Sequence, residues 1–248
     1  MPNAIVTGGN SGIGRATAVA LAACGYDVGF TWHAEAERAA SAVEEIEAHG
    51  RRAVMRQVDL HDGEAGARVV EELADALGSV DCFVSNAGYG TSASVLEITA
   101  EDWRGVVEVD LTAAFLCFQV AARRMVAQGG GGSVVFVTSV HEHIPLRGNA
   151  PYSAAKHGLG GLVKVAALEL AEHGIRVNAV APGQIATRMT GQEDQEPDRS
   201  DGIPLGRAGY AAEIASTIVF LAGEGASYVT GESVVADGGL RWVAAEHQ

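Results

Sequence analysis

The chain has 248 residues, of which 48% are hydrophobic, 19% are charged and 32 are glycine. This length and apolar content predict one sizeable folded domain and exclude an intrinsically disordered chain. The formal net charge of −14 offers no cationic surface for phosphate groups, so we expect no nucleic-acid partner and no binding to an anionic membrane.

The cysteines and the N-terminus indicate where the protein resides. Cys24, Cys82 and Cys117 are isolated, with no CxxC pair and no histidine at metal-ligand spacing, which favours small buried side chains in a reducing compartment over disulfides or a metal site. The first ten residues, MPNAIVTGGN, lack the basic start and apolar stretch of a signal peptide. No uninterrupted apolar run reaches the roughly 18 residues of a membrane span. We therefore expect a cytoplasmic protein without a metal.

Short apolar runs alternate with longer amphipathic or alanine-rich stretches along the whole chain. Strands are expected at residues 4–7, 27–31, 52–57, 82–85, 133–138, 176–181 and 233–235. Helices are expected at residues 12–24, 35–49, 63–77, 100–128, 152–173 and 210–223. Nearly continuous apolar strands suit a parallel sheet that is covered on both faces. The order predicts an α/β, doubly wound (Rossmann), mostly parallel seven-stranded sheet in a single domain over residues 1–248.

One long segment, residues 188–204, has no periodicity. It is polar and ends in proline, and it follows the carboxyl end of an expected strand. Long loops in compact domains are usually functional or disordered, and doubly wound folds bind ligands at the carboxyl ends of their strands. We interpret this segment as a lid over the substrate.

The first expected strand runs directly into a glycine-rich loop and a helix. Glycines there allow a tight turn and the close approach of a pyrophosphate, which backbone N–H groups and the positive end of the helix would hold. A glycine-rich chain also produces such loops as plain turns. The candidate cofactor residues in this loop are Gly8, Asn10, Ser11, Gly12, Ile13 and Gly14.

Tyr152 and Lys156 are four residues apart on an expected helix and share one face of it. A free tyrosine, with a pKa of about 10, is a poor acid or base at neutral pH, but a neighbouring ammonium stabilises the phenolate and lowers this pKa. Tyr152 would then serve as a proton donor and acceptor. Taken alone, this spacing is more often that of ordinary helix residues.

With Thr7, the glycine loop has the pattern TGxxxGxG, and at this point the sequence resembles the short-chain dehydrogenase/reductase family. The resemblance spans Ala4 to about Gly239. Further family motifs follow in order along the chain: Asp59-Leu60, Asn86-Ala87-Gly88, Ser139, Tyr152-x-x-x-Lys156, Asn178 and Pro182-Gly183. It implies an enzyme that transfers a hydride between a nicotinamide cofactor and a small carbonyl or secondary alcohol. Tyr152 would be the general acid and base, Ser139 would orient the substrate oxygen, and Lys156 would also hold the nicotinamide ribose.

The resemblance also implies the remaining cofactor contacts. Asp59 would accept from the adenine amino group beside the Leu60 amide, and the backbone of Asn86, Ala87 and Gly88 would pass close to the adenosine ribose. After Pro182 and Gly183, the side chains of Ile185 and Thr187 would cradle the nicotinamide carboxamide and the pyrophosphate.

The end of the second expected strand bears on the choice of cofactor. NAD enzymes usually place an acidic residue there for the ribose 2′-hydroxyl, whereas this chain has Trp32. Thr31 and His33 could instead donate to a 2′-phosphate. NADP is therefore favoured. NAD remains the alternative, because no lysine or arginine stands at this strand end and because Ser11 occupies the position where NADP-dependent relatives often carry a basic residue.

One position departs from the family pattern. Many relatives carry an asparagine in the long helix, where it supports a water that relays protons to the lysine, and here the corresponding residue is Asp110. An ionised aspartate accepts hydrogen bonds but cannot donate one. Asp110 would serve unchanged if the relay depends on backbone groups, and otherwise it could pair with Lys156 and alter the pH profile. A catalytically silent NADP-binding regulatory protein is the alternative of another class.

The run from Val140 to Pro145 resembles that of bacterial glucose 1-dehydrogenases, and the sequence as a whole also resembles 3-oxoacyl carrier-protein reductases. His141 and Gln184 are the candidate substrate contacts. An acyl carrier protein is acidic, whereas the expected lid carries Glu193, Asp194, Glu196, Asp198 and Asp201. We therefore expect a small soluble carbonyl or alcohol substrate.

The resemblance also implies a homotetramer.

Overall fold

The computed structural model describes residues 1–187, 190–191, 197 and 199–246, and its centre is a parallel sheet. The seven strands lie in the order β3-β2-β1-β4-β5-β6-β9. Their bounds are β1 Asn3–Val6, β2 Asp27–Trp32, β3 Ala53–Gln57, β4 Cys82–Ser85, β5 Gly132–Val137, β6 Ile175–Pro182 and β9 Ser233–Ala236. Each of the seven expected strands is present, and every pairing within this sheet is parallel.

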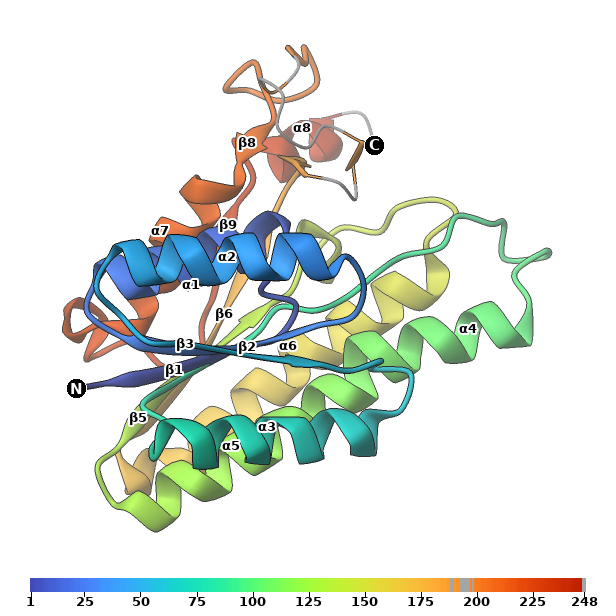
Figure 1. The fold of residues 1–248 in the computed structure, drawn as a ribbon. Coiled ribbons are helices and arrows are strands. Elements are labelled where there is room, and N and C mark those ends of the chain that lie inside the picture. The colour runs from blue at the N-terminus through green and yellow to red at the C-terminus, as the bar shows by residue number, and fades with distance from the viewer. Residues whose placement is uncertain (188–189, 192–196, 198, 247–248) are drawn as a thin grey trace.

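Helices cover both faces of the sheet (Figure 1). One face carries α1 (Gly12–Ala23), α2 (Ala36–Ala48) and α7 (Ala211–Ala222), and the other carries α3 (Gly63–Leu77), α5 (Ala114–Gln128) and α6 (Ala150–Leu170). Each layer encloses its own apolar core. Phe30 and Ile46 belong to the first core, and Phe83 and Phe136 belong to the second. The predicted doubly wound α/β fold is confirmed.

The strand order reverses beside β1, and this reversal positions the site. Ile5 of β1 pairs with Gly29 of β2 on one side and with Phe83 of β4 on the other. The connections that leave β1 and β4 therefore diverge onto opposite faces of the sheet. In open parallel sheets this divergence opens a crevice at the carboxyl ends of the strands, where ligands bind.

The long helix expected at residues 100–128 is present but interrupted. It consists of α4 (Ala100–Val107), a π-helical segment at Glu108–Ala113 and α5. By length and composition alone, Ala100–Gln128 is apolar enough to cross a membrane, with half of its most apolar window buried inside the protein. Here α5 packs against α3 and the sheet as a core helix, which accounts for its apolar character.

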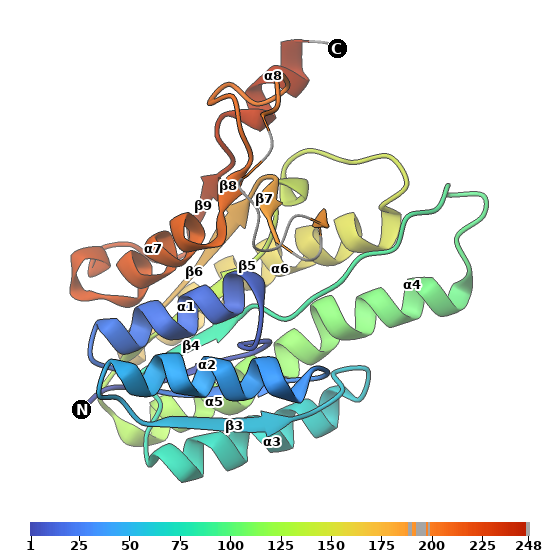
Figure 2. The same cartoon turned by 45° about the horizontal axis from the view of Figure 1, so that its top comes forward.

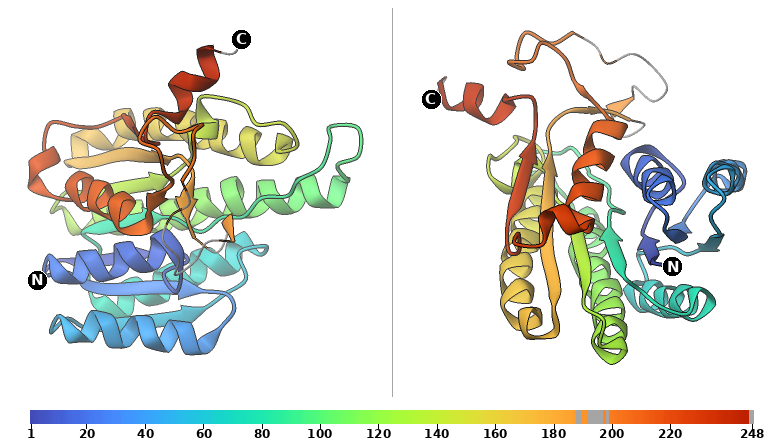
Figure 3. Two further views of the ribbon diagram at one scale, coloured as in Figure 1. Left: turned by 90° about the horizontal axis from the view of Figure 1, so that it is seen from above. Right: turned by 90° about the vertical axis from the view of Figure 1, so that its left-hand side faces the viewer.

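Several short elements have no counterpart among the expected ones. β7 (Ile185–Ala186) and β8 (Gly209–Tyr210) pair over two residues, and α8 (Leu240–Glu246) stands away from the two helix layers (Figures 2 and 3). α6 begins at Ala150 rather than at Tyr152, with a proline in its first turn. Much of the expected lid, including Arg188 and the acidic residues at 193, 194, 196 and 198, lies outside the described residues.

Candidate active site

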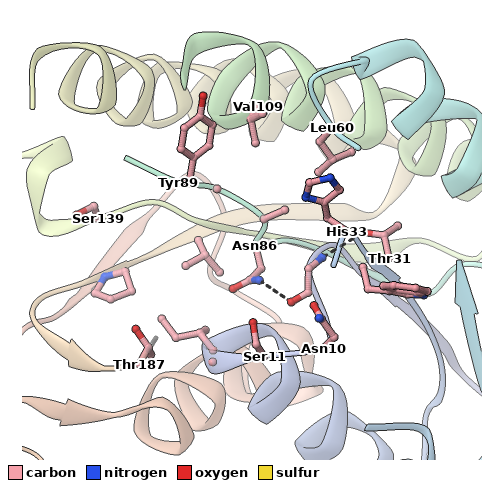
Figure 4. A pocket seen from close by; sticks show the side chains of 18 of the residues that line it. Asn10, Ser11, Thr31, His33, Leu60, Asn86, Tyr89, Val109, Ser139 and Thr187 are labelled. Atoms are coloured by element: carbon pink, nitrogen blue, oxygen red, sulfur yellow. Dashed lines mark hydrogen bonds between the residues drawn. The ribbon is translucent and has the colours of Figure 1, made fainter. Parts of the chain in front are cut away.

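A cleft of about 450 Å³ lies at the carboxyl ends of the central strands. Ser139 lies toward one end of it and His33 and Thr31 toward the other, with Ser11 of the glycine loop facing Val109 across it (Figure 4). Most of the residues that the sequence singled out line this cleft: Gly8, Asn10, Ser11, Gly12, Ile13, Thr31, His33, Asp59, Leu60, Asn86, Ala87, Gly88, Ser139, Tyr152, Lys156, Pro182, Gly183, Ile185 and Thr187.

Four expected site residues are not part of the lining, and several unexpected ones are. Gly14, Asp110, His141 and Gln184 lie outside the lining, although Asp110 contacts Lys156 directly. The cleft also includes residues that the sequence reasoning missed: Trp32, Ala34, Glu35, Val58, His61, Tyr89, Val109, Val137, Thr138 and Thr190. Most of these residues lie next to a recognised motif at the end of a strand, and this proximity is the one feature of the sequence that could have indicated them.

The glycine loop has a backbone that other residues would not adopt. Gly8 and Gly12 have φ values of +68° and +52°, in the left-handed region. Gly14 has no room for a side chain, because a Cβ there would overlap the Gly8 carbonyl oxygen. Thr31 fixes the loop from the neighbouring strand, since its Oγ1 accepts from the Gly8 N–H at 3.1 Å and its carbonyl accepts from the Gly9 N–H at 2.9 Å. The hydroxyl of Thr31 is therefore already engaged with the loop, and the residue is 1% exposed.

The loop after β4 is joined to the loop after β1 through Thr7. The Thr7 hydroxyl accepts from the backbone N–H groups of Asn86 and Ala87 at 2.9 and 3.1 Å. The Asn86 side-chain amide donates in return to the Thr7 carbonyl at 2.9 Å. These bonds hold the two loops together as one rigid wall of the cleft.

Ser139, Tyr152 and Lys156 converge on the cleft from β5 and α6. Ser139 directly precedes a 3-10 turn, Val140–Glu142, and its hydroxyl accepts from the His141 N–H at 3.2 Å. Tyr152 lies in the first turn of α6, and Lys156 lies one turn later with Nζ 5.2 Å from the centre of the tyrosine ring. Lys156 also donates to the Val137 carbonyl at 3.2 Å. This arrangement gives the cleft a hydroxyl, a phenol and an ammonium within a small volume.

Asp110 forms a buried ion pair with Lys156. Its Oδ2 lies 3.1 Å from Lys156 Nζ, and its Oδ1 accepts from the Tyr89 N–H at 2.9 Å. The residue is 0% exposed and lies within the π-helical segment. Burial raises the pKa of Asp110. Burial would lower the pKa of Lys156, but the charges of Asp110 and Tyr152 outweigh it and raise that pKa. Of the two possibilities left open by the sequence, the structure has the pairing with Lys156.

The far end of the cleft is rich in titratable groups. Asp59 Oδ1 accepts from the backbone N–H and the Nδ1 of His61, at 3.0 and 2.8 Å, and the backbone bond above all lowers the pKa of Asp59. His33 Nε2 lies 3.7 Å from Asp59 Oδ2. Glu35, in the same wall, has a φ of +67°, the one non-glycine residue with a positive φ in the described part of the chain. This end therefore carries two carboxylates and two imidazoles.

The turn after Ser139 is held by a buried carboxylate. Glu142 accepts from the Ser233 hydroxyl of β9 at 2.9 Å, and its other oxygen packs against Gly160 of α6, which has no room for a Cβ. His141 Nδ1 lies 3.1 Å from the Ile144 carbonyl, and its ring is edge-on to Tyr152 with centroids 6.4 Å apart. His141 thus lies beside Tyr152 without lining the cleft, and Gln184 bonds Gly209 through its carbonyl.

Comparisons with known proteins agree with this site. A family model described as enoyl-(acyl carrier protein) reductase matches residues 8–241. An uncharacterized oxidoreductase, YohF, of Escherichia coli is 50% identical over 239 residues, which cover 96% of this chain and 94% of that protein. A 3-oxoacyl-[acyl-carrier-protein] reductase of a Synechocystis species is 40% identical over 96% of both chains.

Solved structures extend the comparison. Acetoin dehydrogenase YohF from Salmonella typhimurium superimposes with a TM-score of 0.93 at 46% identity, covering 97% of this chain and 96% of the other. Carveol dehydrogenase from Mycobacterium avium, in complex with NAD, has a TM-score of 0.90 at 31% identity, covering 96% and 97%. With the sheet and the cleft described above, the chain belongs to the short-chain dehydrogenase/reductase family and is an NAD(P)-dependent oxidoreductase of carbonyl and alcohol substrates.

Proposed function

We propose that Tyr152 is the general acid and base of the reaction and that Ser139 orients the substrate oxygen. The observation that carries this proposal is the convergence of Ser139, Tyr152 and Lys156 in the same cleft as the glycine loop. In carbonyl reduction, the Tyr152 hydroxyl donates its proton to the substrate oxygen while the Ser139 hydroxyl donates a hydrogen bond to it. Alcohol oxidation uses the same groups in reverse.

Lys156 and Asp110 support this proton transfer. The ammonium lies beside the tyrosine ring and stabilises the phenolate that remains when the proton has left. The Asp110 carboxylate holds the buried ammonium in place and keeps it charged, since it compensates for the loss of solvent. Where many relatives have a neutral asparagine that supports a proton-relaying water, this chain therefore has a charged partner for Lys156.

The residues of the cleft fit a nicotinamide dinucleotide. The positive φ values of Gly8 and Gly12, and the absence of a side chain at these two positions, leave the backbone open to a pyrophosphate before the start of α1. Asp59 and Leu60 would hold the adenine, and Asn86, Ala87 and Gly88 would lie along the adenosine ribose. Ile185 and Thr187 would hold the nicotinamide half, beside Pro182 and Gly183. When bound, the dinucleotide supplies or accepts the hydride.

We propose NADP as the preferred form, with NAD also accepted. No carboxylate stands at Trp32, and His33 is exposed at the adenosine end, where its protonated form would pair with a 2′-phosphate. Asp59 and Glu35 in the same wall oppose that phosphate and favour NAD. A His33→Ala variant should therefore have a lower ratio of kcat/KM for NADPH to kcat/KM for NADH than the parent.

For the substrate, we propose a small soluble ketone or secondary alcohol, of which acetoin is the first to test. Acetoin appears in the name of a relative that matches almost the whole chain. The acidic balance of the chain argues against the alternative, a 3-oxoacyl group on an acidic carrier protein, although other relatives carry that name. We further propose a cytoplasmic homotetramer, which light scattering after size-exclusion chromatography would test.

A substrate panel with both cofactors tests the function. Acetoin, a diketone, a simple ketone, a sugar and an acyl thioester would be assayed through nicotinamide absorbance. Turnover of acetoin or the diketone well above the thioester supports the proposal, and the reverse order supports the acyl reductase. Binding of NADPH without any turnover would instead favour the regulatory protein.

A further inference from the structure

At the adenosine end of the cleft, three side chains form a continuous hydrogen-bonded chain. Asp59 Oδ1 lies 2.8 Å from His61 Nδ1, and His61 Nε2 lies 3.1 Å from the Tyr89 hydroxyl. The imidazole and phenol rings are also in contact, with centroids 5.4 Å apart. Asp59 follows β3 and Tyr89 follows β4, so these hydrogen bonds link the connections that lead from the two strands to α3 and α4.

The chemistry of the three groups fixes the direction of these bonds. Asp59 is ionised, because the His61 bonds lower its pKa, and a carboxylate only accepts. His61 Nδ1 must therefore donate, and in the neutral imidazole Nε2 then accepts from Tyr89. Burial, together with the charges of Asp110, Asp102 and Asp59, raises the pKa of Tyr89, so its hydroxyl stays protonated and can donate.

Both bonds from His61 fall on the same oxygen of Asp59. The backbone N–H and Nδ1 of His61 occupy Oδ1, while Oδ2 lies 3.7 Å from His33 Nε2, beyond hydrogen-bond distance. The carboxylate, which lines the cleft, is thus held by one oxygen and has the other available as an acceptor.

Helix α4 packs over the hydrogen-bonded side chains of Asp59, His61 and Tyr89 and leaves room for them. A Cβ at Gly105 of α4 would lie 2.5 Å from the Tyr89 hydroxyl and 3.5 Å from His61 Nε2. The Tyr89 ring points toward that helix layer rather than across the cleft (Figure 4). The Tyr89 backbone is fixed separately through its N–H to Asp110. Both ends of the Tyr89 residue are therefore anchored.

We propose that His61 and Tyr89 are positioning residues that aim Asp59 Oδ2 at the exocyclic amino group of the cofactor's adenine. This rests on the proposed role of Asp59 as the adenine acceptor. The amino group donates to Oδ2, whereas a base with a carbonyl at the same position would set two acceptors against each other. The fixed carboxylate thus selects adenine over hypoxanthine.

The test compares adenine and hypoxanthine forms of the dinucleotide, which differ in that one group. We expect the parent enzyme to prefer the adenine form in kcat/KM. His61→Ala, Tyr89→Phe and Gly105→Ala should each lower the adenine-to-hypoxanthine ratio about three- to ten-fold, the effect of one hydrogen bond. His49→Ala, at the exposed end of α2, is the matched control and should leave the ratio unchanged.

Asp59→Asn separates the two levels of the proposal. Its amide can donate to hypoxanthine, so the ratio should collapse. If Asp59→Asn leaves the ratio intact, the adenine role of Asp59 fails, and the positioning role fails with it. If Asp59→Asn collapses the ratio while the His61 and Tyr89 variants, folded by thermal melting, keep the parent value, the positioning role alone is overturned.

Discussion

The carboxylate of Asp110 lies 3.1 Å from the ammonium of Lys156, and both residues are almost entirely shielded from solvent. The negative charge raises the pKa of Lys156 against the effect of burial. Removing the Asp110 charge should lower the pKa of Lys156, since the ammonium loses the carboxylate that stabilises it. For Asp110→Asn, we expect the pH profile of alcohol oxidation to move to lower pH by about one unit.

The measurement is kcat/KM for the alcohol between pH 5 and 10, with Glu101→Gln on the exposed start of α4 as control. An Asp110→Asn profile that coincides with that of the parent would contradict the charge argument. Asp110→Ala is the more severe change, because it leaves a buried ammonium without its partner and should lower the free energy of unfolding by about 3–5 kcal/mol. Denaturant unfolding checks that value.

Tyr152→Phe removes the proton donor and leaves the ring that packs in the cleft. We expect kcat to fall by about a hundred- to ten-thousand-fold, while cofactor affinity, measured by fluorescence titration, stays within a few-fold of the parent. Ser139→Ala should cost somewhat less, since it removes one hydrogen bond to the substrate oxygen. Ketone reduction by Tyr152→Phe at the parental rate would refute the assignment of Tyr152.

Gly14→Ala should abolish cofactor binding. A Cβ at this position would overlap the Gly8 carbonyl oxygen and the Asn86 side chain, so the loop after β1 would have to move. Gly130→Ala is the control, because a Cβ there would have open space around it and the φ of Gly130 is not positive. Isothermal titration with the dinucleotide distinguishes the two, and unchanged affinity in Gly14→Ala would show that the loop tolerates displacement.

Adjacent glycines of α6 provide a matched pair. A Cβ at Gly160 would meet the Glu142 carboxylate, which anchors the turn that follows Ser139, whereas Gly161 faces open space. Gly160→Ala should therefore lower both kcat and thermal stability. Gly161→Ala should be neutral or raise stability by about 0.4–1 kcal/mol, since alanine restricts the unfolded chain. Equal behaviour of the two variants would rule out the Glu142 contact as the cause.

The start of α7 carries a pH-dependent contact. Arg207 binds both carboxylate oxygens of Glu213, at 2.8 and 2.7 Å, and this pairing, with the bond from the Tyr210 N–H, lowers the pKa of Glu213 to about 2. A depressed pKa in the folded state contributes stability that is complete above the ordinary value of 4.5 and is lost as the pH falls toward about 2.

Glu213→Gln should therefore lower Tm at pH 7 by about 2 °C, a small amount because the pair is exposed. The difference from the parent should shrink as the pH falls below 4.5. Calorimetry at pH 7, 4 and 3 checks this, and a difference that does not change with pH would exclude the carboxylate charge as its origin.

The sequence was sufficient for the sheet because apolar strand runs such as Val134–Val137 report burial on both faces directly. It was sufficient for the cleft lining because the motifs are tied to strand ends, and parallel strands bring those ends together. It was not sufficient for the π-helical segment, since Glu108–Ala113 contains no glycine or proline that would mark an interruption of the helix. β7 and β8 were missed because two-residue pairings carry no periodicity.

The same limit applies to the polar contacts of the site. His61 and Tyr89 are separated by 28 residues, and neither belongs to a motif, so only the fold brings them together. Thr31 lines the cleft as expected, but the bond that its hydroxyl accepts from the Gly8 N–H follows from the fold and carries no signal in the sequence. The roles of His141 and Gln184 remain predictions for the substrate assays above.

The π-helical segment at Glu108–Ala113 places one extra residue in the turn of a long helix. The stretches before and after it therefore follow separate phases, and each can face its own neighbours. Deleting one residue there would restore a continuous α-helix and rotate α4 by about 100° relative to α5. Such a rotation would turn Gly105 away from Tyr89 while it withdrew Asp110 from Lys156. A single inserted residue thus sets the geometry at both the adenosine end and the catalytic end of the cleft.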